Sequence, residues 1–121
     1  DEGADVIMPV AGPVGLGAAA AIQERGNAYV IGVDSDWVLT SPEYAEITLT
    51  SVMKLMDATT FQVIESVIDD TFEGGTVVGT LANEGVAIAP FHELEGLISS
   101  ELQSELDQLE ADIISGAIAL D

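Results

Sequence analysis

The sequence contains no cysteine and a single histidine, His92, among its 121 residues. The absence of cysteine excludes disulfide bonds, cysteine-ligated zinc sites and thiol catalysis. One histidine cannot build a metal site that needs several imidazole ligands, and no neighbouring pattern marks it as a catalytic base. We therefore expect no catalytic residues, no metal and no cofactor, and we expect His92 to be a surface or turn residue.

Positive charge is almost as scarce as cysteine. The chain has two cations, Arg25 and Lys54, against 22 acidic side chains, which gives a formal charge of -20. Nucleic-acid binding is excluded, because no basic patch exists to neutralise phosphates. The composition is nevertheless 48% hydrophobic, whereas disordered chains combine high charge with little apolar surface. We therefore expect a folded protein with an acidic coat.

Such a coat is typical of a halophile, although an ordinary acidic protein is the alternative. At about 1 M salt the Debye length falls to roughly 3 Å, so salt would screen the repulsion between the carboxylates. Long apolar runs are also missing, because none approaches the ~20 residues that span a bilayer. The first residues, "DEGADVIM", contain no signal peptide and read like the entry into a strand. We expect the chain to be a piece of a longer protein.

The first part of the chain has the pattern of a strand–helix–strand unit. "DVIMPV" (5–10) is a short apolar run, typical of a strand buried on both faces. "GLGAAAAIQERG" (15–26) predicts a short helix that Gly26 terminates, and "AYVIGV" (28–33) predicts a second buried strand. Because the connection is a crossover helix, the two strands should be parallel and the crossover right-handed.

Further elements are expected after this unit. In chain order they are a strand or extended hinge over 45–54, a helix over 57–72, two strands over 76–81 and 85–90 that a hairpin could join, and a helix over 100–116. The sequence therefore predicts an α/β fold with a parallel βαβ sheet followed by C-terminal helices.

Three features follow the predicted strands at their carboxyl ends, where open parallel sheets bind ligands. The loop "AGPVG" follows the first strand, Asp34 and Asp36 of "DSD" follow the second, and Lys54 closes the third. A glycine such as Gly12 lets a ligand approach the backbone closely. A carboxylate can accept hydrogen bonds from two vicinal hydroxyls, and an ammonium donates three. We therefore predict a ligand cleft formed by Gly12, Asp34 and Lys54, with Asp36 as a weaker candidate because it can face solvent.

Structural roles are the alternatives for each of these residues. Gly12, Gly15 and Gly17 could serve only a tight turn and helix packing, and Lys54 could form a structural salt bridge. Trp37 could stack on a ligand, although bracing of the hinge is the favoured interpretation. "GPVGLG" also mimics a dinucleotide fingerprint, but its glycine spacing is wrong and Pro13 removes one N–H from the loop. A nucleotide-dependent enzyme domain therefore remains an alternative function.

Several segments together resemble the basic membrane protein family, the substrate-binding lipoproteins of ABC transporters, many of which bind purine nucleosides. In chain order the segments are "GADVIMPVAGPVGLGAAAAIQERG", "YVIGVDSDW", "LTSVMK", "GTVVGTLANEGVAIAP" and "LEADIISGAIAL". The resemblance covers essentially the whole chain. It departs at Trp37, where the family usually has glutamine, and at Pro13, where it has a second glycine.

The resemblance implies a type I periplasmic-binding-protein fold of which this chain is the C-terminal half. Residues 1–54 would be the βαβ portion of the C-terminal lobe, and 55–121 a hinge-crossing segment. Asp34 and Lys54 would hold ribose hydroxyls, with the backbone at Gly12 near the ligand. The implied partners are a nucleoside and an ABC permease in the membrane, and the implied location is extracellular, as a cell-surface lipoprotein. A sugar-sensing regulatory domain is a further alternative, because type I binding folds also serve in repressors.

Overall fold

The structure, a computed structural model, describes residues 3–119 and divides the chain into two compact units. The first unit holds the residues up to Met53 together with Ile88–Ser100, and the second holds Lys54–Ala87 together with the residues from Glu101 onward. The chain therefore passes from one unit to the other three times, after residues 53, 87 and 100.

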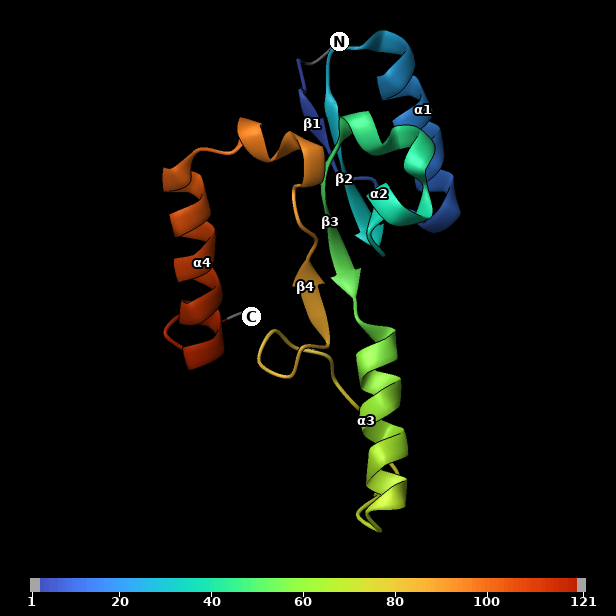
Figure 1. Cartoon of the computed structure of the whole chain (residues 1–121), viewed down its shortest axis with the longest axis vertical. Coiled ribbons are helices and arrows are strands. Elements are labelled where there is room, and N and C mark those ends of the chain that lie inside the picture. The colour runs from blue at the N-terminus through green and yellow to red at the C-terminus, as the bar shows by residue number, and fades with distance from the viewer. Residues whose placement is uncertain (1–2, 120–121) are drawn as a thin grey trace. The chain divides into compact units, whose positions relative to one another are not determined.

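Strands and helices alternate along the chain (Figure 1). In order they are β1 (Val6–Ile7), the 3-10 helix η1 (Gly12–Val14), α1 (Gly15–Arg25), β2 (Tyr29–Asp34), α2 (Trp37–Thr40), η2 (Pro42–Ile47), β3 (Thr48–Lys54), α3 (Met56–Ile68), β4 (Val86–Ile88), η3 (His92–Leu97) and α4 (Ser100–Ser115). The strands form one sheet in the order β1-β2-β3-β4. The fold is thus of the predicted α/β class.

The first unit contains the predicted parallel βαβ arrangement. β1 pairs with β2 and β2 pairs with β3, both in parallel, and α1 connects the first two strands beside the sheet (Figure 1). α1 ends where predicted, at Gly26, whose φ of 69° is left-handed. The Gly26 N–H donates to the carbonyl of Ile22 at 2.8 Å, which caps the last turn of the helix.

A small apolar core lies between α1 and the sheet. α1 buries Gly15, Ala19 and Ile22, which share one face of the helix, and the last two pack with Val30 of β2 and with Trp37. Trp37 is only 5% exposed. Its indole N–H donates to the carbonyl of Val33 at 3.1 Å, so the polar end of the ring is satisfied inside the unit.

β1 differs from its prediction as a strand buried on both faces over 5–10. It is two residues long, and both Val6 and Ile7 are exposed. β1 is the edge of the sheet with β2 as its one neighbour. A pocket of about 520 Å³ is lined by Ile7 of the strand and by Ala18 of α1, among others. An apolar run therefore gave the position of the strand but not its burial.

The buried side chains of β3 are polar. Thr48 and Ser51 are almost completely buried, whereas Val52 is exposed. The Thr48 hydroxyl donates to the carbonyl of Tyr44 at 2.8 Å, and the Ser51 hydroxyl accepts the N–H of Trp37 at 3.0 Å. Each buried hydroxyl thus has a backbone partner, which removes most of the penalty of burying a polar group.

The second unit contains α3, β4 residues 86–87 and most of α4. α3 ends at Ile68, four residues before the predicted end, and Asp69 caps it ahead of "EGG". Neither α3 nor α4 contains a buried residue, and the apolar residues predicted to recur along α3, such as Phe61 and Ile64, are exposed. Among residues 3–119, no helix is long and apolar enough to cross a membrane.

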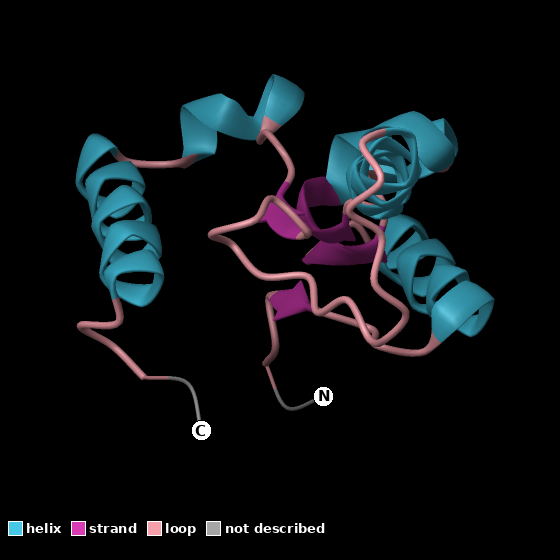
Figure 2. Ribbon diagram, turned by 90° about the horizontal axis from the view of Figure 1, so that it is seen from below, coloured by secondary structure: helices cyan, strands magenta, loops and turns pink. Residues whose placement is uncertain are grey.

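The hairpin suggested for 76–81 and 85–90 is wrong. Residues 69–85 form a loop with no strand (Figure 2). Asn83 closes this loop, because its side-chain oxygen accepts the N–H of Thr80 at 2.7 Å and that of Gly85 at 3.1 Å. β4 pairs instead with β3. The Leu55 N–H donates to the carbonyl of Gly85 at 3.0 Å, and the Ala89 N–H donates to the carbonyl of Ser51 at 2.8 Å. These two bonds have the pattern of an antiparallel pair.

Candidate functional site

Two predicted ligand residues are the last residues of their strands. β2 ends at Asp34 and β3 ends at Lys54. The parallel register pairs Asp34 with Met53, the residue before Lys54. Sequence reasoning placed both residues at strand ends, and the structure has them there. Their role in ligand binding stays a prediction.

Asp34 adopts an unusual backbone conformation. Its φ of 72° lies in the left-handed region, which costs a residue other than glycine roughly 1–2 kcal/mol. Aspartate tolerates this region better than most residues, because its short side chain can bond locally. The side chain is half-buried and its Oδ1 atom is buried. Such strain concentrates at binding and catalytic sites, which makes Asp34 the best candidate among the acids of the first unit.

Asp36 has a defined structural role. Its Oδ1 accepts the N–H of Val38 at 3.0 Å and so caps the short helix α2, and its Oδ2 lies 2.8 Å from Nε2 of His92. The side chain is 11% exposed. The expectation that Asp36 faces solvent is therefore wrong. Both carboxylate oxygens bond within the protein, and a ligand contact by Asp36 stays untested.

His92 is a turn residue, as expected, but it also has a specific partner. It is the first residue of η3, with a φ of 47°, and its side chain is 26% exposed. Its contact with Asp36 joins residues 56 positions apart in sequence. No local pattern links the two residues, so sequence reasoning missed this contact.

The three glycines after β1 differ in whether the local structure requires a glycine, and why. Gly12 has a φ of 55° and open space where a Cβ would stand, so it serves a left-handed turn and leaves its backbone accessible. A Cβ on Gly15 would lie 3.0 Å from the Pro9 carbonyl and 3.3 Å from the Trp37 ring, so Gly15 permits close packing. Gly17 has neither constraint. Whether a ligand approaches Gly12 stays a prediction.

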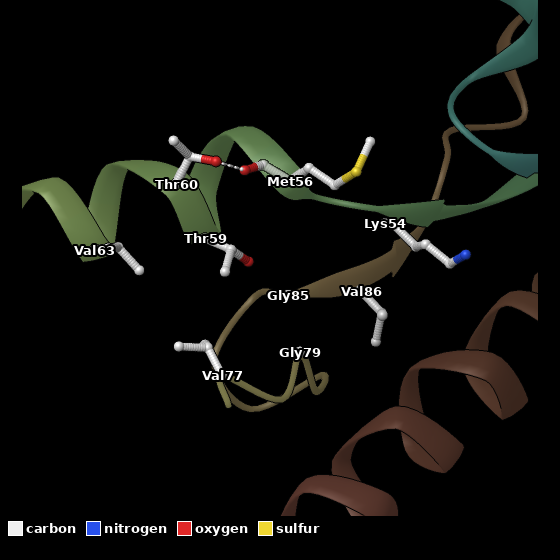
Figure 3. Close-up of a pocket in the computed structure, with 9 residues that line it drawn as sticks. All are labelled: Lys54, Met56, Thr59, Thr60, Val63, Val77, Gly79, Gly85 and Val86. Carbon is white, nitrogen blue, oxygen red and sulfur yellow. Dashed lines mark hydrogen bonds between the residues drawn. The ribbon is translucent and has the colours of Figure 1, made fainter. Parts of the chain in front are cut away.

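A pocket of about 590 Å³ lies in the second unit beside α3 (Figure 3). It is lined by Lys54, Met56, Thr59, Thr60, Val63, Val77, Gly79, Gly85 and Val86. The Lys54 ammonium lies at one end of the pocket and points away from Val63 and Val77 (Figure 3). The hydroxyl of Thr60 donates to the carbonyl of Met56 at 2.6 Å, which leaves the walls mainly apolar.

The apolar stripe along α3 and the glycines of the following loop were the sequence signals for this pocket, but sequence reasoning did not combine them. Within the described part of the chain, residues 3–119, no group of three or more histidine, aspartate or glutamate side chains could hold a metal ion.

Comparison with known proteins connects this geometry to a family. A family model described as "ABC transporter substrate-binding protein PnrA-like" matches residues 1–121. Basic membrane protein A1 of Borrelia garinii subsp. bavariensis is 32% identical over 119 residues, which cover 97% of this chain and 34% of that protein. Basic membrane protein A of Borreliella afzelii is 31% identical over 116 residues, or 94% of this chain and 34% of that protein. The chain thus spans about a third of the length of these relatives.

Solved structures share the fold. A solute-binding protein of an ABC transporter system from Aeropyrum pernix K1 matches 96% of this chain and 40% of its own, with a TM-score of 0.77 and 23% identity. A transcriptional activator of the comK gene from Bacillus halodurans matches 97% of this chain and 39% of its own, with a TM-score of 0.78 and 17% identity. At these identities the likeness shows the fold alone.

Proposed function

This chain belongs to the PnrA-like family of ABC transporter substrate-binding proteins, and from that premise we propose that the protein reversibly binds a nucleoside-like solute. The chain supplies Asp34 and Lys54 to the ligand site, and the backbone at Gly12 lies near the ligand. No chemical step follows binding. The solute passes to an ABC permease in the membrane, and the protein works on the extracellular face as a lipid-anchored component.

The observation that carries this proposal is that an acid and one of the two cations of the chain are the last residues of β2 and β3. β2 ends at Asp34 and β3 at Lys54, and the register aligns the two ends. A half-buried carboxylate accepts hydrogen bonds from two vicinal ribose hydroxyls, and the ammonium donates to the same hydroxyl oxygens while balancing the negative charge. This pair suits a diol, which both accepts and donates hydrogen bonds.

The charge of -20 supports a second part of the proposal, that the protein works at high salt. Carboxylates at this density repel one another in dilute buffer, and molar salt shortens the range of that repulsion to roughly 3 Å. The ligand contacts are shorter-ranged and partly buried, so screening weakens them less.

The test is a titration of the full-length protein in molar salt with adenosine, guanosine, inosine and uridine, followed by the variants Lys54→Ala and Asp34→Ala. Each loss of a charged hydrogen-bonding group is expected to weaken binding by about 1.5–3 kcal/mol, or roughly ten- to 150-fold. Asp34→Ala should also lose most of the preference for ribosides over 2′,3′-dideoxynucleosides, because the acceptor for both hydroxyls is gone.

Two residues offer matched controls. Arg25→Ala removes the other cation, which lies in the last turn of α1, and Asp5→Ala removes an exposed acid just before β1. Both should bind like the parent, because they lie away from the carboxyl ends of the strands. Unchanged affinity in Lys54→Ala and Asp34→Ala, with both proteins folded, would exclude the proposed diol contacts. Absence of binding by the parent would exclude these nucleosides as the solute.

A further inference from the structure

One side-chain pair ties the turn after β2 to a segment far along the chain. His92 Nε2 lies 2.8 Å from Asp36 Oδ2, and both residues belong to the first unit. The side chains are 26% and 11% exposed, so water screens their contact only in part. Asp36 follows Asp34 by two residues, which means that the pair joins η3 directly to the turn that carries the candidate ligand carboxylate.

β3 anchors both sides of this connection. Ala89, three residues before His92, donates its N–H to the carbonyl of Ser51 at 2.8 Å. On the other side, the Ser51 hydroxyl accepts the N–H of Trp37 at 3.0 Å. Ser51 is 0% exposed, so neither bond competes with water. The contact between His92 and Asp36 therefore closes a ring of hydrogen bonds that starts and ends at Ser51.

The ring includes one residue in the left-handed region, His92, and a second such residue, Asp34, lies two positions before Asp36. Asp34 has a φ of 72° and His92 a φ of 47°, both left-handed. A residue in this region keeps its conformation only when its surroundings determine it by more than one contact. Asp36 Oδ1 accepts the N–H of Val38, which fixes the part of the turn that follows Asp34. The orientation of that carboxylate depends on its other oxygen, which is the atom that His92 holds.

We infer that His92 is a positioning residue. Through Asp36 it holds residues 34–38 in the conformation that presents the Asp34 carboxylate. His92 itself bonds to Asp36, two residues beyond the candidate ligand residue, and acts on ligand affinity only through the turn. This last step rests on the proposed function, whereas the fixing of the turn does not.

Two measurements on the full-length protein in molar salt test the inference. The first is hydrogen–deuterium exchange of the peptide covering residues 34–41, and the second is the dissociation constant for the tightest binder among adenosine, guanosine, inosine and uridine. In His92→Ala, faster exchange and about fivefold weaker binding are expected, the size of one net hydrogen bond. His92→Gln can still donate an amide N–H to Asp36 and should restore most of both values.

The matched control is Glu93→Ala, which changes the exposed neighbour of His92 and should alter neither value. A double-mutant cycle shows whether His92 acts through Asp36. Asp36→Ala alone and the double variant Asp36→Ala/His92→Ala are then expected to lose the same affinity. If His92→Ala is too unstable to measure, His92→Asn takes its place and is compared with His92→Gln. The asparagine side chain is too short to reach Asp36.

Several outcomes would overturn the inference. Unchanged exchange over residues 34–41 in His92→Ala would show that the contact does not fix the turn. Faster exchange with an unchanged dissociation constant would show that the turn does not position the ligand carboxylate. Additive losses in the cycle would mean that His92 acts independently of Asp36. If the parent binds none of the nucleosides, the proposed function fails, and the exchange data decide the role of His92 by themselves.

Discussion

Replacement of Gly32 by alanine is expected to destabilise the first unit far more than one added methyl group suggests. Gly32 lies in β2, and a Cβ there would collide with Oγ of Ser51 and stand 2.6 Å from Cγ of Trp37. Neither neighbour is the free end of a flexible side chain, because Ser51 and Trp37 are buried and hydrogen-bonded to each other. The methyl group therefore has to displace part of the core.

The magnitude follows from three contributions. Overpacking of a filled core costs about 1–3 kcal/mol. Separation of Ser51 from the Trp37 N–H gives up a hydrogen bond worth about 1 kcal/mol. Alanine also restricts the unfolded chain, which offsets the loss by about 0.4–1 kcal/mol. The net expectation is that Gly32→Ala lowers the free energy of unfolding by about 2–3 kcal/mol, dominated by the packing term.

Gly17→Ala is the matched control, because it adds the same methyl group where nothing lies within 4 Å. Gly17 is exposed in α1, so alanine should raise the free energy of unfolding by about 0.5–1 kcal/mol through its helix propensity. Urea denaturation of the full-length protein at fixed salt measures both. Equal stability of the two variants would refute the reasoning, since it would show that the contact between Trp37, Ser51 and β2 is loose.

Two other expectations concern the surface and the second unit. The melting temperature should rise steeply from dilute buffer to molar sodium chloride, beyond the gain from sucrose at equal osmolality, because salt screens the carboxylates; a flat response would remove the proposed salt adaptation. Asn83→Ala removes the acceptor of the Thr80 and Gly85 amides, so limited proteolysis should cut within residues 78–86 faster than in the parent. The control Asn27→Ala, at an exposed turn, should show the cleavage pattern of the parent.

Local signals predicted much of the first unit. Gly26 terminates α1 because it adopts the left-handed conformation that a helix C-terminus requires, and this preference can be read from one residue and its neighbours. The parallel pairing of β1 with β2 followed from the crossover rule, which is almost independent of sequence detail. The strand ends at Asp34 and Lys54 were predicted from the apolar run and the alternating run that lead up to them.

Features that depend on distant partners could not be predicted. Alternation along β3 indicated a strand, but the polar face is the buried one because Thr50 finds the carbonyl of Ala89, 39 residues away, at 2.6 Å. The contact between Asp36 and His92 is also long-range. The hairpin failed for a local reason that was overlooked: Asn83 offers side-chain bonds that compete with a strand ladder.

The positions of the two cations argue for local roles. If the chain needed cations only to reduce its net charge, almost any surface position would serve, because long-range repulsion depends little on where a charge lies. Arg25 instead lies in the last turn of α1, where a cation stabilises the C-terminal carbonyls. Lys54 lies at the end of β3, next to the register partner of Asp34. At molar salt only contacts within roughly 3 Å escape screening. A cation that is useful under such conditions has to act on an immediate neighbour, and the proposed function makes the ligand one such neighbour of Lys54.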